Sequence, residues 1–144
     1  MIPLDPSRCI TQTRFGGDPR GGNCAEAACA TLLGIALDDI TDFRQQYDPL
    51  YPGNEAYYYW TSFENLFESK GYLITRHKEN YCPECFYLAS GKANRGYSHM
   101  VVMYDGQLAW DPHPDRTGLL SINHVWVPVP IDPMMFVRKA SEQA

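Results

Sequence analysis

A cysteine, a histidine and an aspartate of this chain are spaced so that they could together attack an acyl group. Cys24 follows the glycine-rich segment GGDPRGGN and starts a helix-like segment. A thiol attacks a carbonyl carbon as its thiolate, and the unpaired amide groups at a helix N-terminus favour that anion. The same amides could hold a developing oxyanion, and glycines allow a substrate to approach closely. The alternative is that Cys24 only packs, as most free cysteines do.

A thiol nucleophile needs a base, and the base needs a group that orients it. The candidates are His99, which opens an apolar run, and Asp111, which ends the next one. A three-residue loop at 104–106 would place His99 directly opposite Asp111 on one face of a hairpin, whereas a two-residue turn would point Asp111 to the other face. The sequence YDG favours the three-residue loop. The alternative is a structural histidine near a strand-terminal aspartate.

The first half of the chain has helical patterns that would position the thiol. Apolar residues at helical spacing predict a helix over 24–33. Asn23 suits its N-cap, Glu26 would complete a capping box, and Gly34 would end the helix. Two further helices are predicted, over residues 38–47 and 55–70.

After Gly71 the pattern changes to short apolar segments separated by turn residues, which is typical of β-strands. Strands are predicted over residues 72–75, 85–90, 98–104, 107–111, 124–129 and 134–139. Helices followed by strands indicate an α+β fold. No composition shift marks a boundary, so we expect a single domain over residues 1–144.

Composition restricts the possible partners. The chain has 144 residues and a net charge of -5. Phosphate binding requires clustered lysine and arginine, so we expect no nucleic acid partner. No apolar run approaches the length of a membrane span, and MIPLDPSRC does not resemble a signal sequence. We therefore expect no membrane partner and a cytoplasmic protein.

The five cysteines are expected to be reduced, because an odd number without a signal sequence does not suggest a disulfide scaffold. Cys82 and Cys85 have the Cys-x-x-Cys spacing of a zinc site. Zinc requires four ligands, and Cys9, His77 and His124 do not stand at typical spacing. Two thiols at a turn are the favoured interpretation, with no metal or cofactor. A zinc module remains an alternative.

Three other clusters have two interpretations each. Lys92 and Arg95 could contact an anionic substrate, although solvated cations are the simpler interpretation. The motif DPHPD at 111–115 could bind a metal, but a proline-fixed turn that presents Asp111 is favoured. The aromatic run at 57–60 could line a groove, but aromatic residues at helical spacing usually belong to the core.

The segments GGNCAEAACATLLG and SHMVVM…LAWDPHP resemble the papain-like cysteine peptidase superfamily, in particular its bacterial and phage branch of NlpC-type peptidases. The resemblance implies a central helix packed on an antiparallel sheet. It implies that Cys24 is the nucleophile, His99 the base and Asp111 the orienting residue. Some relatives have a histidine as the third residue, which keeps His113 as an alternative to Asp111.

The resemblance also implies a glutamine that donates to the oxyanion. Gln12 is the candidate, although TRFGGDPRGGN separates it from the cysteine by more than in the family, and Asn23 is the alternative donor. The expected function is a thiol-dependent peptidase, amidase or acyl transferase without a cofactor. Its substrate would be a peptide or amide, with a host protein as one candidate, in the host cytoplasm if the protein comes from a phage. The alternative function is a catalytically silent papain-like binding protein, for example a phage factor that blocks a host protein.

Overall fold

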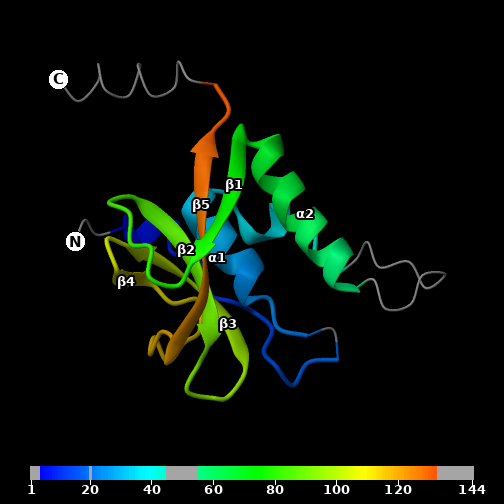
Figure 1. Ribbon diagram of the computed structural model, residues 1–144. Helices are drawn as coiled ribbons and strands as arrows, with labels where there is room; N and C mark the ends of the chain where they lie inside the picture. The colour runs from blue at the N-terminus through cyan, green and yellow to red at the C-terminus, as the bar shows by residue number, and fades with distance from the viewer. Residues whose placement is uncertain (1–3, 20, 45–54, 133–144) are drawn as a thin grey trace.

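One antiparallel sheet and two α-helices make up most of the computed structural model, which describes residues 4–19, 21–44 and 55–132 (Figure 1). The helices are α1 (Cys24–Leu33) and α2 (Glu55–Ser69), with 3-10 turns η1 (Pro6–Arg8) and η2 (Leu37–Asp39). The strands are β1 (Tyr72–Lys78), β2 (Phe86–Lys92), β3 (Ser98–Tyr104), β4 (Gln107–Trp110) and β5 (Ser121–Pro130). Their order in the sheet is β1-β5-β2-β3-β4, and every neighbouring pair is antiparallel. The α+β class is therefore confirmed.

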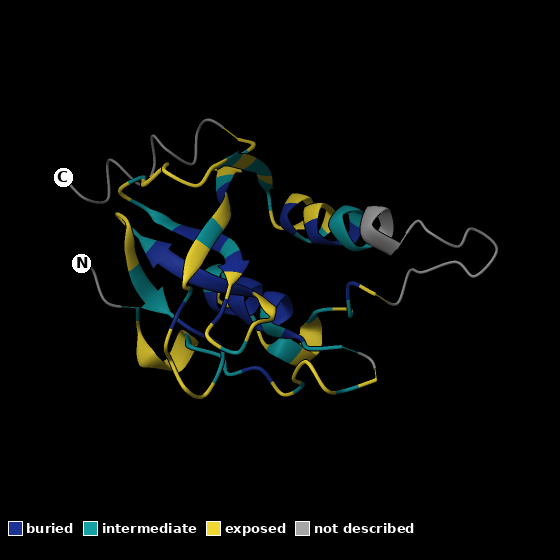
Figure 2. Ribbon diagram, turned by 60° about the horizontal axis from the view of Figure 1, so that its bottom comes forward, coloured by how far each residue is buried: buried dark blue, intermediate teal, exposed yellow. Residues whose placement is uncertain are grey.

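The main core lies between the helices and one face of the sheet. Helix α1 packs on β2 and β3, and α2 packs on β1. The shared core contains side chains from both helices and three strands, namely Ala25, Ala28, Cys29, Phe63, Phe67, Leu88, Met100, Val102 and Trp126. Figure 2 shows α1 buried along most of its length, as expected for a helix made mostly of small and apolar residues. Helix α1 is thus the fixed centre of the fold.

A second apolar cluster covers the other face of the sheet. It contains Tyr87, Ala89, Val101, Met103, Val125 and Val127. Successive side chains of a strand point to opposite faces, so β3 is buried on both sides through Met100 to Met103. This burial makes β3, which begins with Ser98 and His99, a rigid support.

The predicted elements agree with the structure for α1, for α2 and for five of the six strands. The helix predicted over 38–47 is wrong in its described part, because the chain forms only η2 and then an irregular segment to Arg44. The Asp42 carboxylate accepts a hydrogen bond from the Arg44 backbone N–H at 2.9 Å, which favours a local turn over helix. Residues 45–47 and the strand predicted over 134–139 lie outside the described residues.

The capping box predicted at the start of α1 is also wrong. Asn23 stands at the N-cap, but its side-chain oxygen accepts from the backbone N–H groups of Thr13 (3.0 Å) and Arg14 (2.8 Å). Asn23 therefore ties the N-terminal arm to the helix instead of capping it. The side chain of Glu26 is buried elsewhere. Gly34 ends the helix in a left-handed conformation with φ 70°, as predicted.

The hairpin between β3 and β4 differs from the predicted three-residue loop. Tyr104 pairs with Gln107 across a two-residue turn whose residues Asp105 and Gly106 have φ of 49° and 77°. The register then shifts, because Met103 pairs with Leu108 but Val102 pairs with Trp110. Ala109 is thus the extra residue of a β-bulge. After a bulge of one residue, each later side chain points to the face of the sheet opposite to the one it would otherwise occupy. This shift determines where Asp111 points.

Candidate active site

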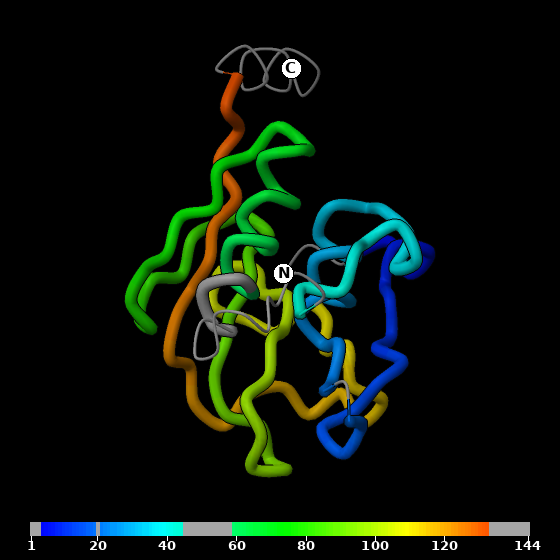
Figure 3. The backbone as a smooth tube through the Cα atoms, turned by 90° about the vertical axis from the view of Figure 1, so that its right-hand side faces the viewer, coloured from blue at the N-terminus to red at the C-terminus, as the bar shows by residue number. Residues whose placement is uncertain are grey.

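The N-terminal arm lies along the segment that follows β4. Figure 3 shows this arm in dark blue beside the yellow-orange chain beyond residue 110. The Gln12 backbone N–H donates to the Pro112 carbonyl at 3.0 Å, and the Trp110 indole N–H donates to the Ile10 carbonyl at 2.8 Å. The Arg116 guanidinium donates to the hydroxyl of Thr11 at 2.8 Å. These contacts fix residues 10–12 of the arm on the segment after β4, and the next residue, Thr13, donates its backbone N–H to the side chain of Asn23 just before α1 at 3.0 Å.

A cleft of about 670 Å³ opens between this arm, the start of α1 and the ends of β2, β3 and β5. Cys24, the first residue of α1, is half-buried and lines it. The cleft walls include the candidate residues Gln12, Cys24, His99 and His113, the arm glycines 16, 17, 21 and 22, and the aromatic residues Phe15, Tyr59, Trp60 and Tyr97. The thiol is therefore at the inner wall of a cleft and not sealed in the core.

His99 lies between Cys24 and Asp111. Its Nε2 is 2.6 Å from the Asp111 Oδ1, and both side chains are almost completely buried. The imidazole also interacts with the thiol of Cys24, which raises the pKa of His99, and both side chains line the cleft. Since Asp111 occupies Nε2, the nitrogen that remains for the thiol is Nδ1. Three side chains that are distant in sequence are thus brought together at the cleft.

The carboxylate of Asp111 is held by two backbone groups in addition to the imidazole. Its Oδ1 accepts from the His113 N–H at 2.9 Å, and its Oδ2 accepts from the Gly118 N–H at 2.7 Å. Burial raises the pKa of Asp111, but the hydrogen bonds with His99, His113 and Gly118 outweigh burial and lower the pKa below its usual value. Asp111 is therefore an ionised carboxylate in a fixed orientation.

This environment favours the protonated form of His99. Burial lowers the pKa of His99, but hydrogen bonds with Asp111 and Cys24 and the charges of both groups raise the pKa to about 9. The imidazole therefore carries a proton at neutral pH. A thiolate at Cys24 would gain a charge-assisted hydrogen bond from this imidazolium.

His113 is near the imidazole but does not orient it. The ring centroids of His99 and His113 are 6.3 Å apart at 81°. The Nδ1 of His113 accepts a hydrogen bond from the Asp115 N–H at 3.1 Å. Asp111, rather than His113, therefore occupies the position next to the base.

Gln12 reaches the cleft despite its distance from Cys24 in the sequence. It is buried, and its side-chain nitrogen donates to the Arg14 carbonyl at 2.8 Å. One of its two amide N–H bonds is left for another acceptor. Asn23, the alternative donor, directs its amide nitrogen to the Thr13 hydroxyl at 2.8 Å and is absent from the cleft walls among the described residues.

The other candidate residues are the pair Cys82 and Cys85, the DPHPD segment and Arg95. Cys82 is exposed and Cys85 is half-buried. Within residues 4–19, 21–44 and 55–132, no three His, Cys, Asp or Glu side chains are grouped closely enough to hold a metal ion, including those of the DPHPD segment. Arg95 lines the cleft and forms an ion pair with Asp115, so it links the β2–β3 loop to this segment.

Sequence reasoning missed part of the cleft wall. The aromatic run at 57–60 was assigned to the core, yet Tyr59 and Trp60 belong both to the core and to the cleft. Asn123 and His124 also line the cleft, next to a register shift between β2 and β5. No local pattern marks that shift, because it depends on the pairing of distant strands.

The cleft brings together a thiol at a helix N-terminus, an imidazole and a buried carboxylate, which are the types of group that thiol-dependent acyl transfer uses. A comparison of the chain with protein-family models, with curated proteins and with solved structures finds no match.

Proposed function

We propose that the protein is a thiol-dependent hydrolase or acyl transferase that acts on an amide bond through Cys24, His99 and Asp111. The observation that carries the proposal is the position of the His99 ring, which hydrogen bonds with the Asp111 carboxylate and lines the same cleft as the Cys24 thiol, with which it interacts. A histidine buried for stability alone would not need a thiol at the first turn of a helix on its other side.

The proposed reaction starts from the thiolate–imidazolium pair. The Cys24 sulfur attacks the carbonyl carbon of the amide and forms a tetrahedral oxyanion. His99 then donates its proton to the amide nitrogen, the C–N bond breaks, and an amine leaves a thioester on Cys24. Neutral His99 next takes a proton from water or from an acceptor amine, which attacks the thioester and restores the thiolate. Asp111 stays ionised throughout and holds the ring in one orientation.

The oxyanion would be held at the start of α1. Backbone N–H groups of the first turn have no partner within the helix and point towards the incoming carbonyl. The free N–H of the Gln12 amide is the proposed second donor, since Gln12 lines the same cleft as Cys24. Glycines 16, 17, 21 and 22 on the cleft wall leave room for a main chain to approach.

The arrangement of elements supports a papain-like core in one domain over residues 1–144. In the proposed core the nucleophile begins the central helix, and the base and the carboxylate come from the antiparallel sheet and the segment after it. The substrate would be a peptide or another amide-containing molecule in the cytoplasm. Of the described residues, none forms a helix with the length and apolar character that crossing a bilayer requires.

Selective alkylation tests the proposal. We expect iodoacetamide at pH 6 to label Cys24 first, as identified by peptide mass spectrometry, because a thiolate at this position would gain a charge-assisted hydrogen bond from the His99 imidazolium. Cys82 is an internal control, since it is exposed but has no imidazole partner of this kind. A His99→Gln variant should lose the selectivity. Equally slow labelling of Cys24 and Cys82 would contradict the proposal and favour the silent binding protein.

A further inference from the structure

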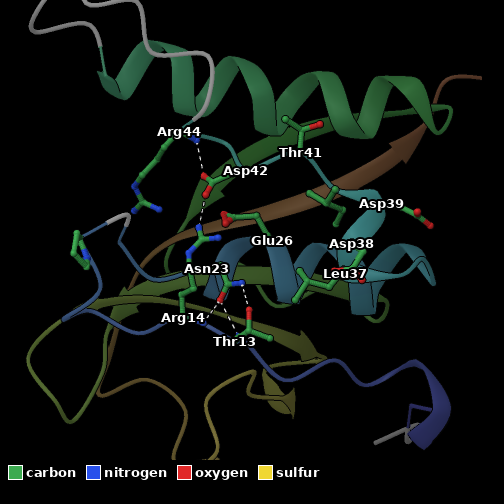
Figure 4. A pocket seen from close by; sticks show the side chains of 12 residues that line it. Thr13, Arg14, Asn23, Glu26, Leu37, Asp38, Asp39, Thr41, Asp42 and Arg44 are labelled. Carbon is green, nitrogen blue, oxygen red and sulfur yellow. Dashed lines mark hydrogen bonds and ion pairs between the residues drawn. The ribbon is translucent and has the colours of Figure 1, made fainter.

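A second cavity, of about 710 Å³, lies between the N-terminal arm and the segment 37–44 (Figure 4). Glu26 of α1 lines it. Cys24 and Glu26 are two residues apart, and side chains at this spacing on a helix point in different directions. Cys24 lines the cleft and Glu26 lines this cavity, so α1 separates two sites.

The carboxyl group of Glu26 is an unusual feature of this cavity. Glu26 is 2 % exposed, and neither of its side-chain oxygens has a hydrogen-bond partner among the described residues. Figure 4 shows the group directed from α1 towards the guanidinium of Arg14 and the carboxylate of Asp42. A buried carboxylate without a partner is unfavourable, so the observed arrangement leaves a place for a cationic donor.

The arginines near Glu26 are engaged elsewhere. Arg14 forms an ion pair with Asp42 and donates to the Gly21 carbonyl at 3.2 Å. Arg44 donates to the Gly22 carbonyl at 2.9 Å. Neither guanidinium therefore satisfies the oxygens of Glu26.

The cavity as a whole is acidic. It is lined by the acidic residues Glu26, Asp38, Asp39 and Asp42 and by Arg14 and Arg44. When Glu26 is ionised, two negative charges remain in excess. Asp42 is matched by Arg14, and Arg44 offsets one of the three remaining charges, so the excess is shared between Glu26 on one side and the aspartates of η2 on the other.

The distribution of these charges over the wall indicates the class of ligand. No three acidic side chains among the described residues converge closely enough to hold one metal ion. The wall also includes Leu37 and Ile40, which belong to η2 and its C-terminal end. Two separated anionic regions with apolar side chains in the same wall match an alkyl chain that carries an ammonium group at each end.

We propose that this cavity binds an aliphatic diamine. One ammonium group would donate to the carboxylate of Glu26, the other would lie against Asp38 and Asp39, and the alkyl chain would pack on Leu37 and Ile40. The cavity adjoins the cleft of Cys24 at Arg44, which lines both, but the proposal does not depend on the proposed catalytic function.

Binding should depend on pH, because the groups around Glu26 control its charge. Burial and the nearby Asp42 raise the pKa of Glu26 to about 7, while Arg44 and Arg14 oppose the shift. Cys29 of α1 and Tyr59 of α2 also interact with Glu26, and burial raises the pKa of both, so neither is charged near neutral pH. An ammonium ligand keeps its charge in this range, so its affinity should rise about tenfold between pH 6 and pH 8 as Glu26 ionises.

Isothermal titration calorimetry with 1,4-diaminobutane at pH 8 tests the site on the full chain. We expect one saturable site per chain. Glu26→Gln, which keeps the size and removes the charge, should weaken binding by about tenfold or more. Glu64→Gln makes the same change on an exposed residue of α2 and should leave binding unchanged. Nα-acetyl-lysine amide has a single ammonium group and should bind about tenfold more weakly. This probe shows whether the cavity prefers a free diamine to a lysine side chain.

Three results would overturn the proposal. They are no saturable binding of 1,4-diaminobutane, equal affinity in Glu26→Gln and the parent protein, and equal affinity for the lysine amide and the diamine. Should Glu26→Gln fail to fold in a thermal unfolding experiment, the pH dependence of the parent protein decides instead. An affinity that does not change between pH 6 and pH 8 would then reject the role of Glu26.

Discussion

The Nε2 of His99 and the Oδ1 of Asp111 lie 2.6 Å apart because a bulge at Ala109 interrupts β4. The two-residue turn at Asp105–Gly106 alone would direct Asp111 to the opposite face of the sheet from His99. The extra residue restores the common face just before the strand ends at Trp110. The site thus depends on a local irregularity of the sheet, as is common for bulges near functional residues.

The first prediction concerns the carboxylate of this pair. Asp111→Asn removes the negative charge that favours the imidazolium form of His99. We expect iodoacetamide labelling of Cys24 at pH 8 to slow by about tenfold or more, because a His99 pKa that returns from about 9 towards 6.5 leaves little imidazolium at that pH. Asp115→Asn, whose carboxylate is partly exposed and pairs with Arg95, is the matched control. Equal labelling rates in both variants would show that Asp111 does not support His99.

The juxtaposition of His99 and Asp111 was predictable from the sequence, but its geometry was not. The residue types and the two apolar runs identified the pair, since alternation along a strand is a local signal. The predicted three-residue loop was wrong because Asp105 and Gly106 both adopt positive φ and form a two-residue turn. The compensating bulge at Ala109 is set by how β4 packs on β3, which no local pattern encodes.

At the start of α1 the sequence likewise predicted the element but not its contacts. Helical spacing and Gly34 located the helix correctly. The capping box is absent because Asn23 accepts hydrogen bonds from the backbone of the arm, and because Glu26 is directed into a cavity beside the segment 37–44, where its side-chain oxygens have no hydrogen-bond partner among the described residues. The tertiary arrangement overrode a good local motif.

The second prediction is a loss of stability at alkaline pH. The pKa of His99 is raised from 6.5 to about 9 in the folded protein. The stability from this group is therefore fully present below pH 6.5 and is lost as the pH rises through about 9. We expect the free energy of unfolding, measured with urea, to fall over this window at no more than about 1.4 kcal/mol per pH unit.

A His99→Gln variant separates this effect from that of Glu26. The pKa of Glu26 is also raised, from 4.5 to about 7, so its contribution is lost as the pH rises through a lower window. The variant should retain the decrease below pH 7 and lose the decrease above it. A decrease above pH 7 that persists in His99→Gln would assign the effect to another group.

The third prediction tests the close approach of two strands beside the cleft. Gly91 pairs with His99 in β3 and with Ile122 in β5, and a Cβ built on Gly91 would be 1.9 Å from the Ser121 carbonyl oxygen. Gly91→Ala forces the backbone of β2 and β5 apart, and we expect it to destabilise the protein by about 2 kcal/mol or more in urea unfolding.

Gly17 provides the control for this substitution. A Cβ on Gly17 meets nothing within 4 Å, and its φ lies outside the left-handed region. Gly17→Ala should therefore change the free energy of unfolding by about 0.5 kcal/mol or less. Similar values for both alanine variants would show that β2 and β5 can separate at little cost.

The fourth prediction separates oxyanion stabilisation from activation of the thiol. Acylation of Cys24 by p-nitrophenyl acetate passes through a tetrahedral oxyanion, whereas alkylation by iodoacetamide displaces iodide and forms none. Gln12→Ala should therefore slow the release of nitrophenolate by about 10²-fold, the usual effect of losing one oxyanion donor. The rate of alkylation should stay nearly unchanged, because Gln12 does not contact the His99–Asp111 pair through any hydrogen bond among the described residues. If both rates fell together, the role of Gln12 would be to hold the arm against α1. If neither fell, the backbone N–H groups at the start of α1 would suffice to stabilise the oxyanion.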